Sequence, residues 1–276
     1  MSYPYSMRLF YDVIGISKQG VYDMEHRWRK RSESMENLLC MVQEIRSKHP
    51  TMAVRHMYHK LQPQNIGRDK FEEFCSIHGL GAKRHRNYRR TTDSYGVKRF
   101  ENLERGFTPQ SMNQLWQSDI TYFEVMGRFY YLTFIVDSFS RYIVGYSVSK
   151  YLMTEHTTIP ALKMAIKFRK KENVSNLILH SDGGGQYYDK DFLKLTKSYN
   201  IRNSMCEYAW ENGKAERING VIKNNYLIHK NITSFNMLVK EVGKTVRLYN
   251  TDKPHCKLNY LTPADYEKML SLQIEN

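Results

Sequence analysis

The stretch LWQSDITYFEVMGRFYYLTFIVDSFSRYIVGYSVS, residues 115–149, decides the fold. It is rich in aromatic and β-branched residues, and turn signals at Met126-Gly127 and Asp137-Ser138 divide it into three parts. Residues of these types favour β-strands, because their side chains pack well on a pleated surface. We therefore predict three successive strands, over 116–125, 129–136 and 142–149, and the simplest arrangement for them is an antiparallel meander.

Helical and strand patterns alternate after this stretch. Ile159, Leu162 and Ile166 lie on one face of a predicted helix over 158–171, and the apolar run 177–179 is consistent with a short buried strand. A helix over 189–199, a strand over 201–205 and a long helix over 211–229 follow. This order predicts an α/β fold, a ribonuclease-H-like mixed five-stranded sheet with flanking helices.

The first 105 or so residues are predicted to form short helices connected by basic segments. Together they make a small all-α region that resembles a helix-turn-helix. Ser17 is the predicted N-cap of a helix that starts in the segment 15–22. That segment is half of a helix-turn-helix or, equally well, the start of an ordinary capped helix. Further helices are predicted over 34–48, over 51–62 with Thr51 as the cap, and over 68–78, where Gly79 stops the helix.

The charge of the chain indicates a polyanionic partner. Lys and Arg number 42 against 28 Asp and Glu, which gives a formal net charge of +14 and a pI of about 9.5. The alternative is a basic surface that is simply solvated. The densest basic run is a predicted DNA contact with an aromatic side chain for base stacking, although such runs are usually solvated linkers. Its residues are Lys83, Arg84, Arg86, Tyr88, Arg89 and Arg90.

Several other classes of protein are disfavoured. The four cysteines show no close pairing, so neither a disulfide framework nor a redox motif is indicated. His56 and His59 lie close together, but no Cys-x-x-Cys follows, and we reject a zinc site. The longest apolar run, 129–136, is too short to span a membrane, and the N-terminus lacks the apolar segment of a signal peptide. We expect a cytoplasmic protein without a membrane partner.

Two aspartates occupy positions where a sheet presents ligands. Asp119 lies within the first predicted strand and Asp182 at the end of the fourth, so the two carboxylates can meet beyond the strand ends. The glycines 183–185 remove side chains where the backbone must approach a metal or a phosphate. An Asp-Gly-Gly sequence alone is more often a surface turn.

A glutamate on the last predicted core helix is the third candidate. At about 100° per residue, Asn212, Asn219, Gly220 and Lys223 share a stripe with Glu216. Ile218, Val221 and Ile222 lie on the opposite side and would anchor the helix to the core. Because Gly220 has no side chain, it would leave room beside Glu216 for a large substrate. The alternative is that Glu216 is an ordinary solvated residue on an amphipathic helix. Three converging carboxylates can hold two divalent cations for phosphodiester chemistry.

The chain resembles the second-frame (orfB) proteins of the IS3 family of bacterial insertion-sequence transposases, which share a ribonuclease-H-like core with retroviral integrases. The motifs that carry the resemblance are LWQSDITY (115–122), VDSFSRYIVG (136–145), HSDGGGQY (180–187), ENGKAER (211–217) and the C-terminal segments 249–250, 254–255 and 261–263. Residues 15–22 and 90–94 also resemble the family. The likeness therefore covers nearly the whole chain.

The resemblance implies that Asp119, Asp182 and Glu216 form a catalytic triad that binds two Mg²⁺ ions, with Mn²⁺ as a substitute. Water would cut DNA at the element ends, and the released 3′-hydroxyl would attack a second phosphodiester without a covalent protein intermediate. The first attack by a 3′-hydroxyl would join one element end to the other and lead to a circular intermediate. Lys223 fits a basic family position that contacts DNA at the reacting end, and Asn212 is a further predicted DNA contact.

One departure from the family pattern is that thirty-three residues separate Asp182 from Glu216, where the family usually has thirty-five. We place the deletion in the loop 206–210, which leaves the phase of the helix intact. Asp137 also conforms to a family motif, and we interpret it as a turn-former rather than a metal ligand.

The implied partners are DNA, at the element ends and the target, and further copies of this chain, since strand transfer at two ends requires at least two protomers. Family members often act as a fusion to an upstream-frame protein with a helix-turn-helix and a coiled coil, and no heptad run occurs in this chain. Two alternatives are a catalytically silent DNA-binding regulator of the fused transposase and a host-adopted integrase.

The predicted domains are a helical DNA-binding region (1–82), a basic linker (83–108), the ribonuclease-H-like catalytic core (109–232) and a C-terminal helical extension (233–276).

Overall fold

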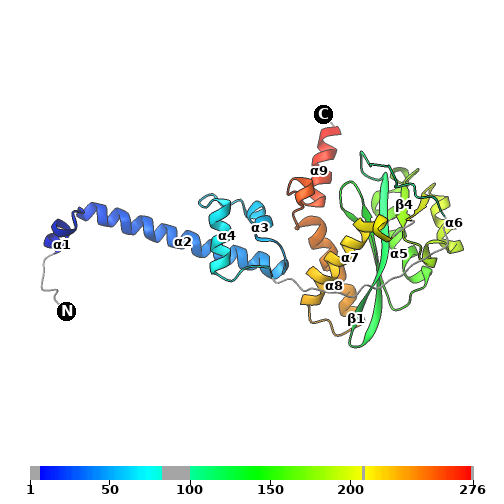
Figure 1. The fold of residues 1–276 in the computed structure, drawn as a ribbon, viewed down its shortest axis with the longest axis horizontal. Helices are drawn as coiled ribbons and strands as arrows, with labels where there is room; N and C mark the ends of the chain where they lie inside the picture. Colours follow the sequence, from blue (N-terminus) through cyan, green and yellow to red (C-terminus); the bar gives the residue numbers. More distant parts are fainter. Residues whose placement is uncertain (1–6, 83–99, 207–208, 275–276) are drawn as a thin grey trace.

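The computed structural model describes residues 7–82, 100–206 and 209–274, and its centre is a five-stranded mixed sheet (Figure 1). The strands are β1 (Leu115–Val125), β2 (Arg128–Asp137), β3 (Ile143–Ser149), β4 (Ile178–Ser181) and β5 (Arg202–Met205), in the order β3-β2-β1-β4-β5. The first three strands are antiparallel neighbours, whereas β4 runs parallel to β1 and β5 parallel to β4. The predicted meander and the mixed α/β sheet are confirmed.

Local chemistry explains the two turns of the meander. Met126 and Gly127 both have positive φ, 50° and 76°, and this conformation suits a two-residue hairpin between Val125 and Arg128. At the second turn the carboxylate of Asp137 accepts the backbone N–H groups of Asn113, Phe139 and Ser140 at 2.7–3.2 Å. Asp137 is therefore a turn-former, as predicted.

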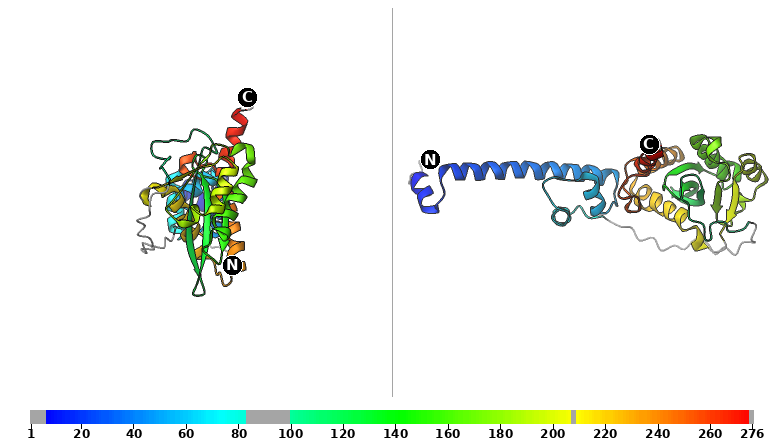
Figure 2. Two further views of the ribbon diagram at one scale, coloured as in Figure 1. Left: turned by 90° about the vertical axis from the view of Figure 1, so that its right-hand side faces the viewer. Right: turned by 90° about the horizontal axis from the view of Figure 1, so that it is seen from above.

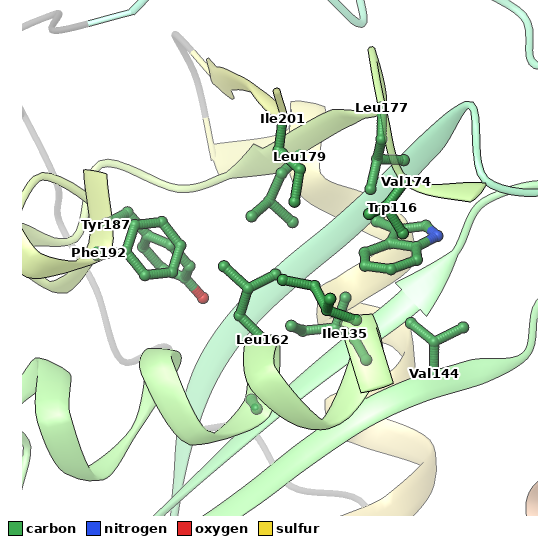
Figure 3. Close-up of a cluster of buried hydrophobic side chains, with 13 residues drawn as sticks. Trp116, Ile135, Val144, Leu162, Val174, Leu177, Leu179, Tyr187, Phe192 and Ile201 are labelled. Carbon is green, nitrogen blue, oxygen red and sulfur yellow. The ribbon is translucent and has the colours of Figure 1, made fainter. Parts of the chain in front are cut away.

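Helices cover both faces of the sheet. On one face α5 (Thr158–Arg169) and α6 (Lys190–Ser198) enclose a hydrophobic core around Trp116, and Figure 3 shows how Leu162, Leu179 and Phe192 converge there. On the other face α7 (Gly213–Asn225) and α8 (Phe235–Thr251) close a second core with β2 and β3. The sheet is thus the middle layer of three.

The last core helix differs from the prediction. A single helix over 211–229 was expected, but α7 ends at Asn225, with a 3₁₀ turn before it (Ala209–Asn212) and another after it (Leu227–His229). Tyr226, at the break, is 2% exposed and has φ −129°, so its packing takes the chain out of the helix.

The predicted C-terminal extension contains α8 and α9 (Pro263–Ile274). Leu238, Val242 and Val246 of α8 belong to the second core of the sheet. The domain boundaries at 82, 108 and 232 stay predictions.

The N-terminal region contains α1 (Met7–Ile14), α2 (Lys18–Lys48), α3 (Val54–Leu61) and α4 (Arg68–Ile77). Its helices were expected to be short, and this was wrong for α2, which has 31 residues because no helix breaker interrupts it after its first turn. Ser17 caps α2 as predicted, accepting the Gly20 N–H at 3.0 Å. The cap of α3 is Ala53 rather than Thr51, and α4 ends next to His78 and Gly79, the latter with φ +65°.

The second half of α2 forms a small hydrophobic core with α3 and α4, built on Val42, Met57, Phe71 and Cys75. The first half of α2 projects away from this core (Figure 2). Within the described ranges, none of the helices combines the length and the apolar character needed to cross a membrane. The helix-turn-helix interpretation of residues 15–22 stays a prediction.

Polar contacts join this helical unit to the sheet unit. His49, after α2, is 1% exposed, and its two ring nitrogens lie 2.8 Å from the Tyr226 hydroxyl and 2.7 Å from an Asp252 carboxylate oxygen. Lys60 of α3 donates to the other Asp252 oxygen at 2.6 Å, and the His59 ring stacks on Tyr260 at 3.6 Å.

Candidate active site

Two aspartates meet at the centre of the sheet, where β1 and β4 run side by side. The register pairs Ser118 with Ser181, the last residue of β4, so Asp119 and Asp182 are the next residues on the two chains. Asp119 continues along β1, whereas the chain turns away after Asp182, whose carboxylate accepts the Gly184 N–H at 3.1 Å. This arrangement brings the two predicted carboxylates to one strand end.

The two carboxylates destabilise each other's charge. Burial raises the pKa of Asp119 to about 8, and the charges of Asp182 and Glu216 add to that rise, while hydrogen bonds from Ile120 and Asn219 oppose it. Burial also raises the pKa of Asp182. Binding of a proton or a metal cation between the two carboxylates would reduce this repulsion and is therefore favoured.

Glu216 lies on the first turns of α7 with its side chain exposed, within electrostatic range of Asp119. In the part of the chain that the structure describes, no group of three or more His, Cys, Asp or Glu side chains is arranged to hold a metal ion. Carboxylate oxygens are nevertheless suitable ligands for a hard divalent cation such as Mg²⁺. The raised pKa of Asp119 means that its negative charge is unfavourable in this site, and a bound cation would stabilise that charge.

The stripe predicted to share a helix side with Glu216 faces β1. Asn219 donates to Asp119 Oδ2 at 2.7 Å, Asn212 donates to the Ser118 carbonyl at 3.0 Å, and the ammonium of Lys223 donates to Thr121 Oγ1 at 2.7 Å. Asn212 and Asn219 are buried, at 1% and 5% exposure. Glu216 itself is exposed and faces away from the packed side, as predicted. The same expectation was wrong for Asn212, Asn219 and Lys223, because amide and ammonium groups can pack where β1 offers them acceptors.

The geometry limits what two of the predicted DNA contacts can do in this conformation. The Asn212 side chain is enclosed between α7 and β1, and Lys223 uses its ammonium on β1 and lies over the Tyr122 ring at 5.3 Å. Burial lowers the pKa of Lys223, against the opposing charge of Asp119. The six predicted contacts of the basic run, Lys83, Arg84, Arg86, Tyr88, Arg89 and Arg90, lie outside the described residues, as do residues 207 and 208 of the shortened loop.

Glu104, which falls in the predicted linker, was not among the site residues predicted from the sequence. Both of its carboxylate oxygens accept from Gln117 at 2.6 Å, and the carboxylate also lies 3.2 Å from His180 Nε2 and 3.4 Å from the Lys214 ammonium. These partners belong to β1, β4 and α7, the elements that carry the three acidic residues. Asn219, in contrast, has a sequence signal, since it lies three residues after Glu216 and so on the same helix side.

Comparison with known proteins agrees with the motifs. Two family models described as integrase core domain match residues 109–209 and 198–263. An uncharacterised 31 kDa protein of insertion element IS600 from Shigella sonnei is 29% identical over 266 residues, which cover 93% of this chain and 96% of that protein. The transposase of insertion sequence IS629 from Shigella sonnei is 29% identical over 234 residues, covering 83% and 77%. The transposase InsF of IS3A from Escherichia coli K12 is 30% identical over 194 residues, covering 68% and 66%.

Among solved structures, the catalytic core domain of HTLV-2 integrase in complex with magnesium, in its trimeric form, aligns with a TM-score of 0.46 and 25% identity over 56% of this chain and 95% of that one. The simian T-cell lymphotropic virus intasome in complex with a PP2A regulatory subunit aligns with a TM-score of 0.44 and 18% identity over 80% and 72%.

The sheet topology and the matched family models define an integrase-core protein, an enzyme of the polynucleotidyl transferase type. Within that class the chain belongs to the IS3 family of insertion-sequence transposases. DNA is therefore its substrate class, and DNA recombination is the process it serves.

Proposed function

We propose that Asp119, Asp182 and Glu216 are the catalytic residues, that they hold two Mg²⁺ ions or Mn²⁺ in their place, and that this site cuts and rejoins DNA at the ends of an insertion sequence. The observation that carries the proposal is the register of β1 and β4, which places Asp119 beside Asp182, with Glu216 within electrostatic range of Asp119. When bound, two such ions activate the attacking oxygen and stabilise the leaving oxygen of a phosphodiester.

The residues of the chain have separate tasks. Asp119 and Asp182 are fixed by hydrogen-bonded strands, and the Asn219 amide orients one oxygen of Asp119. Glu216 is exposed on α7 and is free to change rotamer toward the aspartates when substrate and cations arrive. The site thus combines two preorganised ligands with one adjustable ligand.

The proposed reaction has two steps at this site. In the first, water attacks the phosphodiester at the element end, the P–O bond to the 3′ oxygen breaks, and that oxygen leaves as a 3′-hydroxyl. In the second, the 3′-hydroxyl attacks another phosphodiester, so that one P–O bond forms as another breaks. By family resemblance the second step joins one element end to the other, which leads to a circle. Two element ends require two sites, and we propose a homo-oligomer on DNA.

The test is strand cleavage and joining on an oligonucleotide copy of the element end, with the full chain and Mg²⁺. We expect Asp119→Asn, Asp182→Asn and Glu216→Gln each to lower the rate by about 1,000-fold or more, while DNA affinity stays within a few-fold of wild type. Glu172→Gln, at an exposed position beside α5, is the matched control and should cut normally. Cleavage that survives Glu216→Gln would exclude the triad.

In cells that carry the element, the joined-ends circle junction should form with wild type and be absent with Glu216→Gln. The same assay with and without an upstream frame tests the proposed fusion partner. DNA binding by the wild-type chain without any junction would favour a regulator or a host-adopted protein.

A further inference from the structure

Basic side chains from three distant parts of the chain gather around Tyr249, which is 2% exposed at the end of α8. The His255 ring packs edge-on against Tyr249 at 4.8 Å, and the Lys253 ammonium lies 5.8 Å from the centre of the same ring. Arg141, from the β2–β3 turn, and Arg217, from α7, lie within electrostatic range of Tyr249 and of each other. We call Arg141, Arg217, Lys253 and His255 the Tyr249 cluster.

The cations of this cluster have no anionic partner among the residues that the structure describes. The side chains of Arg141, Arg217 and Lys253 form neither an ion pair nor a hydrogen bond there. Two other partly buried cations do have such a partner: Arg169 holds Glu267 through its two terminal guanidinium nitrogens, and Lys60 holds Asp252. Arg217 is exposed, whereas Arg141 and Lys253 are partly buried, and a partly buried cation without a direct counter-charge is unfavourable.

The nearby carboxylates are all engaged by other groups. Asp252 is held by His49 and Lys60, and Asp137 accepts three backbone N–H groups. Glu104 is held by Gln117 and Lys214. The charges of Asp137 and Glu104 reach Arg141 from a distance, but among the described residues none of the three carboxylates forms a direct ion pair with the Tyr249 cluster.

The cluster also shows two local strains. Arg141 has φ +64°, a backbone conformation that side chains with a Cβ rarely adopt and that occurs preferentially at functional positions. His255 Nε2 is buried and has no hydrogen-bond partner within the described residues. Both observations fit a site that is completed by a ligand.

Burial first, and mutual repulsion second, lower the pKa values of two members of the cluster. Burial lowers the pKa of Lys253 to about 8, and the charge of Arg217 lowers it further. Burial likewise lowers the pKa of His255 to about 3, together with the charges of Lys253, His56, Arg141 and Arg217. An anion at this position would reverse these effects.

We propose that the Tyr249 cluster is a binding site for a backbone phosphate of DNA. Guanidinium groups match phosphate oxygens with paired hydrogen bonds, and an ammonium adds a point charge. Arg217 directly follows Glu216 on α7, so the bound phosphate would belong to the strand segment beside the candidate active site. His56 of α3 lies within electrostatic range of His255, so the cluster borders the N-terminal helical unit. The ligand assignment rests on the proposed function, which supplies DNA as the substrate.

The test is the salt dependence of DNA binding by the full-length chain, measured for wild type, Arg141→Gln, Lys253→Gln and the double variant. Each phosphate contact contributes about 0.9 to the slope of log K against log salt for duplex DNA. We expect the double variant to lose about one unit of slope and about tenfold in affinity near physiological salt, equally for element-end and unrelated DNA. Lys163→Gln, an exposed position on α5 across the sheet, is the matched control and should keep the wild-type slope.

The melting temperature of each variant tests whether it folds. Removing a cation from an unneutralised cluster should leave the melting temperature unchanged or raise it. Inorganic phosphate, compared with chloride at equal ionic strength, should raise the melting temperature of wild type and not that of the double variant. If the variants lose this phosphate effect but keep the full DNA slope, the site takes a free anion and the DNA assignment is overturned.

Strand cleavage distinguishes this proposal from the proposed function. The same slope loss should appear in an Asp119→Asn background, which binds DNA without cutting it. A chain that cuts DNA but shows an unchanged slope in Arg141→Gln/Lys253→Gln would overturn the phosphate site alone, and a chain that shows the slope loss but never cuts DNA would overturn the proposed function alone.

Discussion

The helices α5 and α7 lie on opposite faces of the sheet and are fastened to it in different ways. On α5 the contacts are apolar: Ala161, Leu162 and Ala165 are fully buried, and Gly145 of β3 lies so close that an added Cβ would be 2.9 Å from Ala165 Cβ. On α7 two isoleucines pack into the core, while a separate row of polar side chains hydrogen-bonds to β1. That row is Asn212, Asn219 and Lys223.

From this difference we expect α5 to contribute mainly to stability and the polar row of α7 to contribute to the proposed chemistry. An apolar contact needs no particular direction, whereas the hydrogen bond from Asn219 fixes the orientation of one carboxylate oxygen of Asp119. Stability and strand cleavage should therefore respond separately to changes in the two helices.

The largest effect on stability is expected on the α5 side. Leu162→Ala removes three buried heavy atoms from the core shown in Figure 3 and should lower the free energy of unfolding by about 3 kcal/mol. Urea unfolding measures the loss. Cleavage per folded molecule should stay near wild type, and Met164→Ala, on the exposed side of the same helix, should change stability by less than about 0.5 kcal/mol. A selective loss of cleavage in folded Leu162→Ala would contradict the division between the helices.

On the α7 side the effect should fall on chemistry. Asn219→Ala removes the amide that orients Asp119 and should lower the cleavage rate about 10- to 100-fold, while stability falls by only about 1 kcal/mol. Single-turnover cleavage at saturating Mg²⁺ measures the rate. Asn203→Ala is the matched control, because the Asn203 amide makes a similar bond, to Thr196 at 2.9 Å, on the far side of β5. Equal rates in the two variants would show that Asn219 has only a structural role.

The features that could be predicted from the sequence are those that depend on local patterns. Strand-forming residues with clear turn signals located β1, β2 and β3 within one or two residues, and the exposed turn at Met126-Gly127 was visible because its chemistry is local. The placement of Asp119, within β1, beside Asp182, directly after β4, follows from the order of strands and helices. These features depend on short-range patterns and on general rules of sheet topology.

What the sequence could not show depends on contacts between distant segments. Glu104 has no pattern of its own, and its position is set by Gln117, His180 and Lys214, from 13 to 110 residues away. The break after α7 depends on the burial of Tyr226 against His49, 177 residues distant. Helical phase identified the polar side of α7 correctly, but phase cannot tell whether a polar side meets solvent or a strand.

A smaller change, at Gly220 on α7, tests the role assigned to this helix. An alanine Cβ there would have no neighbour nearer than Asn224 Nδ2 at 4.0 Å, so Gly220→Ala should raise stability by up to about 1 kcal/mol through helix propensity. We expect it to weaken cleavage several-fold, since the methyl group takes up room beside Glu216. Gly243→Ala on α8 is the control, and its gain should be smaller because its Cβ would lie 3.0 Å from the Tyr146 hydroxyl. A variant that gains stability and cuts at the full rate would show that the room left by Gly220 is not needed.

The smallest expected effect concerns the C-terminal end of α7, where Tyr226 bonds to His49. Burial lowers the pKa of His49, and the charges of Lys60 and Lys253 lower it further, against the opposing hydrogen bond and charge of Asp252. The folded protein therefore keeps this imidazole neutral at pH values where the unfolded chain, with a pKa of about 6.5, takes up a proton. The stability that neutral His49 contributes is present above pH 6.5 and is lost as the pH falls through that value.

We expect His49→Gln to be less stable than wild type by about 1 kcal/mol at pH 7.5, and the gap to close as the pH falls to 5.5. Urea unfolding at the two pH values measures the gap, and His26→Gln, at an exposed position on α2, should track wild type at both. A gap that widens in acid would mean that His49 is charged in the folded protein and held mainly by its ion pair with Asp252. In that case an ion pair would hold the end of α7, unlike the amide hydrogen bonds of Asn212 and Asn219, which join the start and middle of the helix to β1.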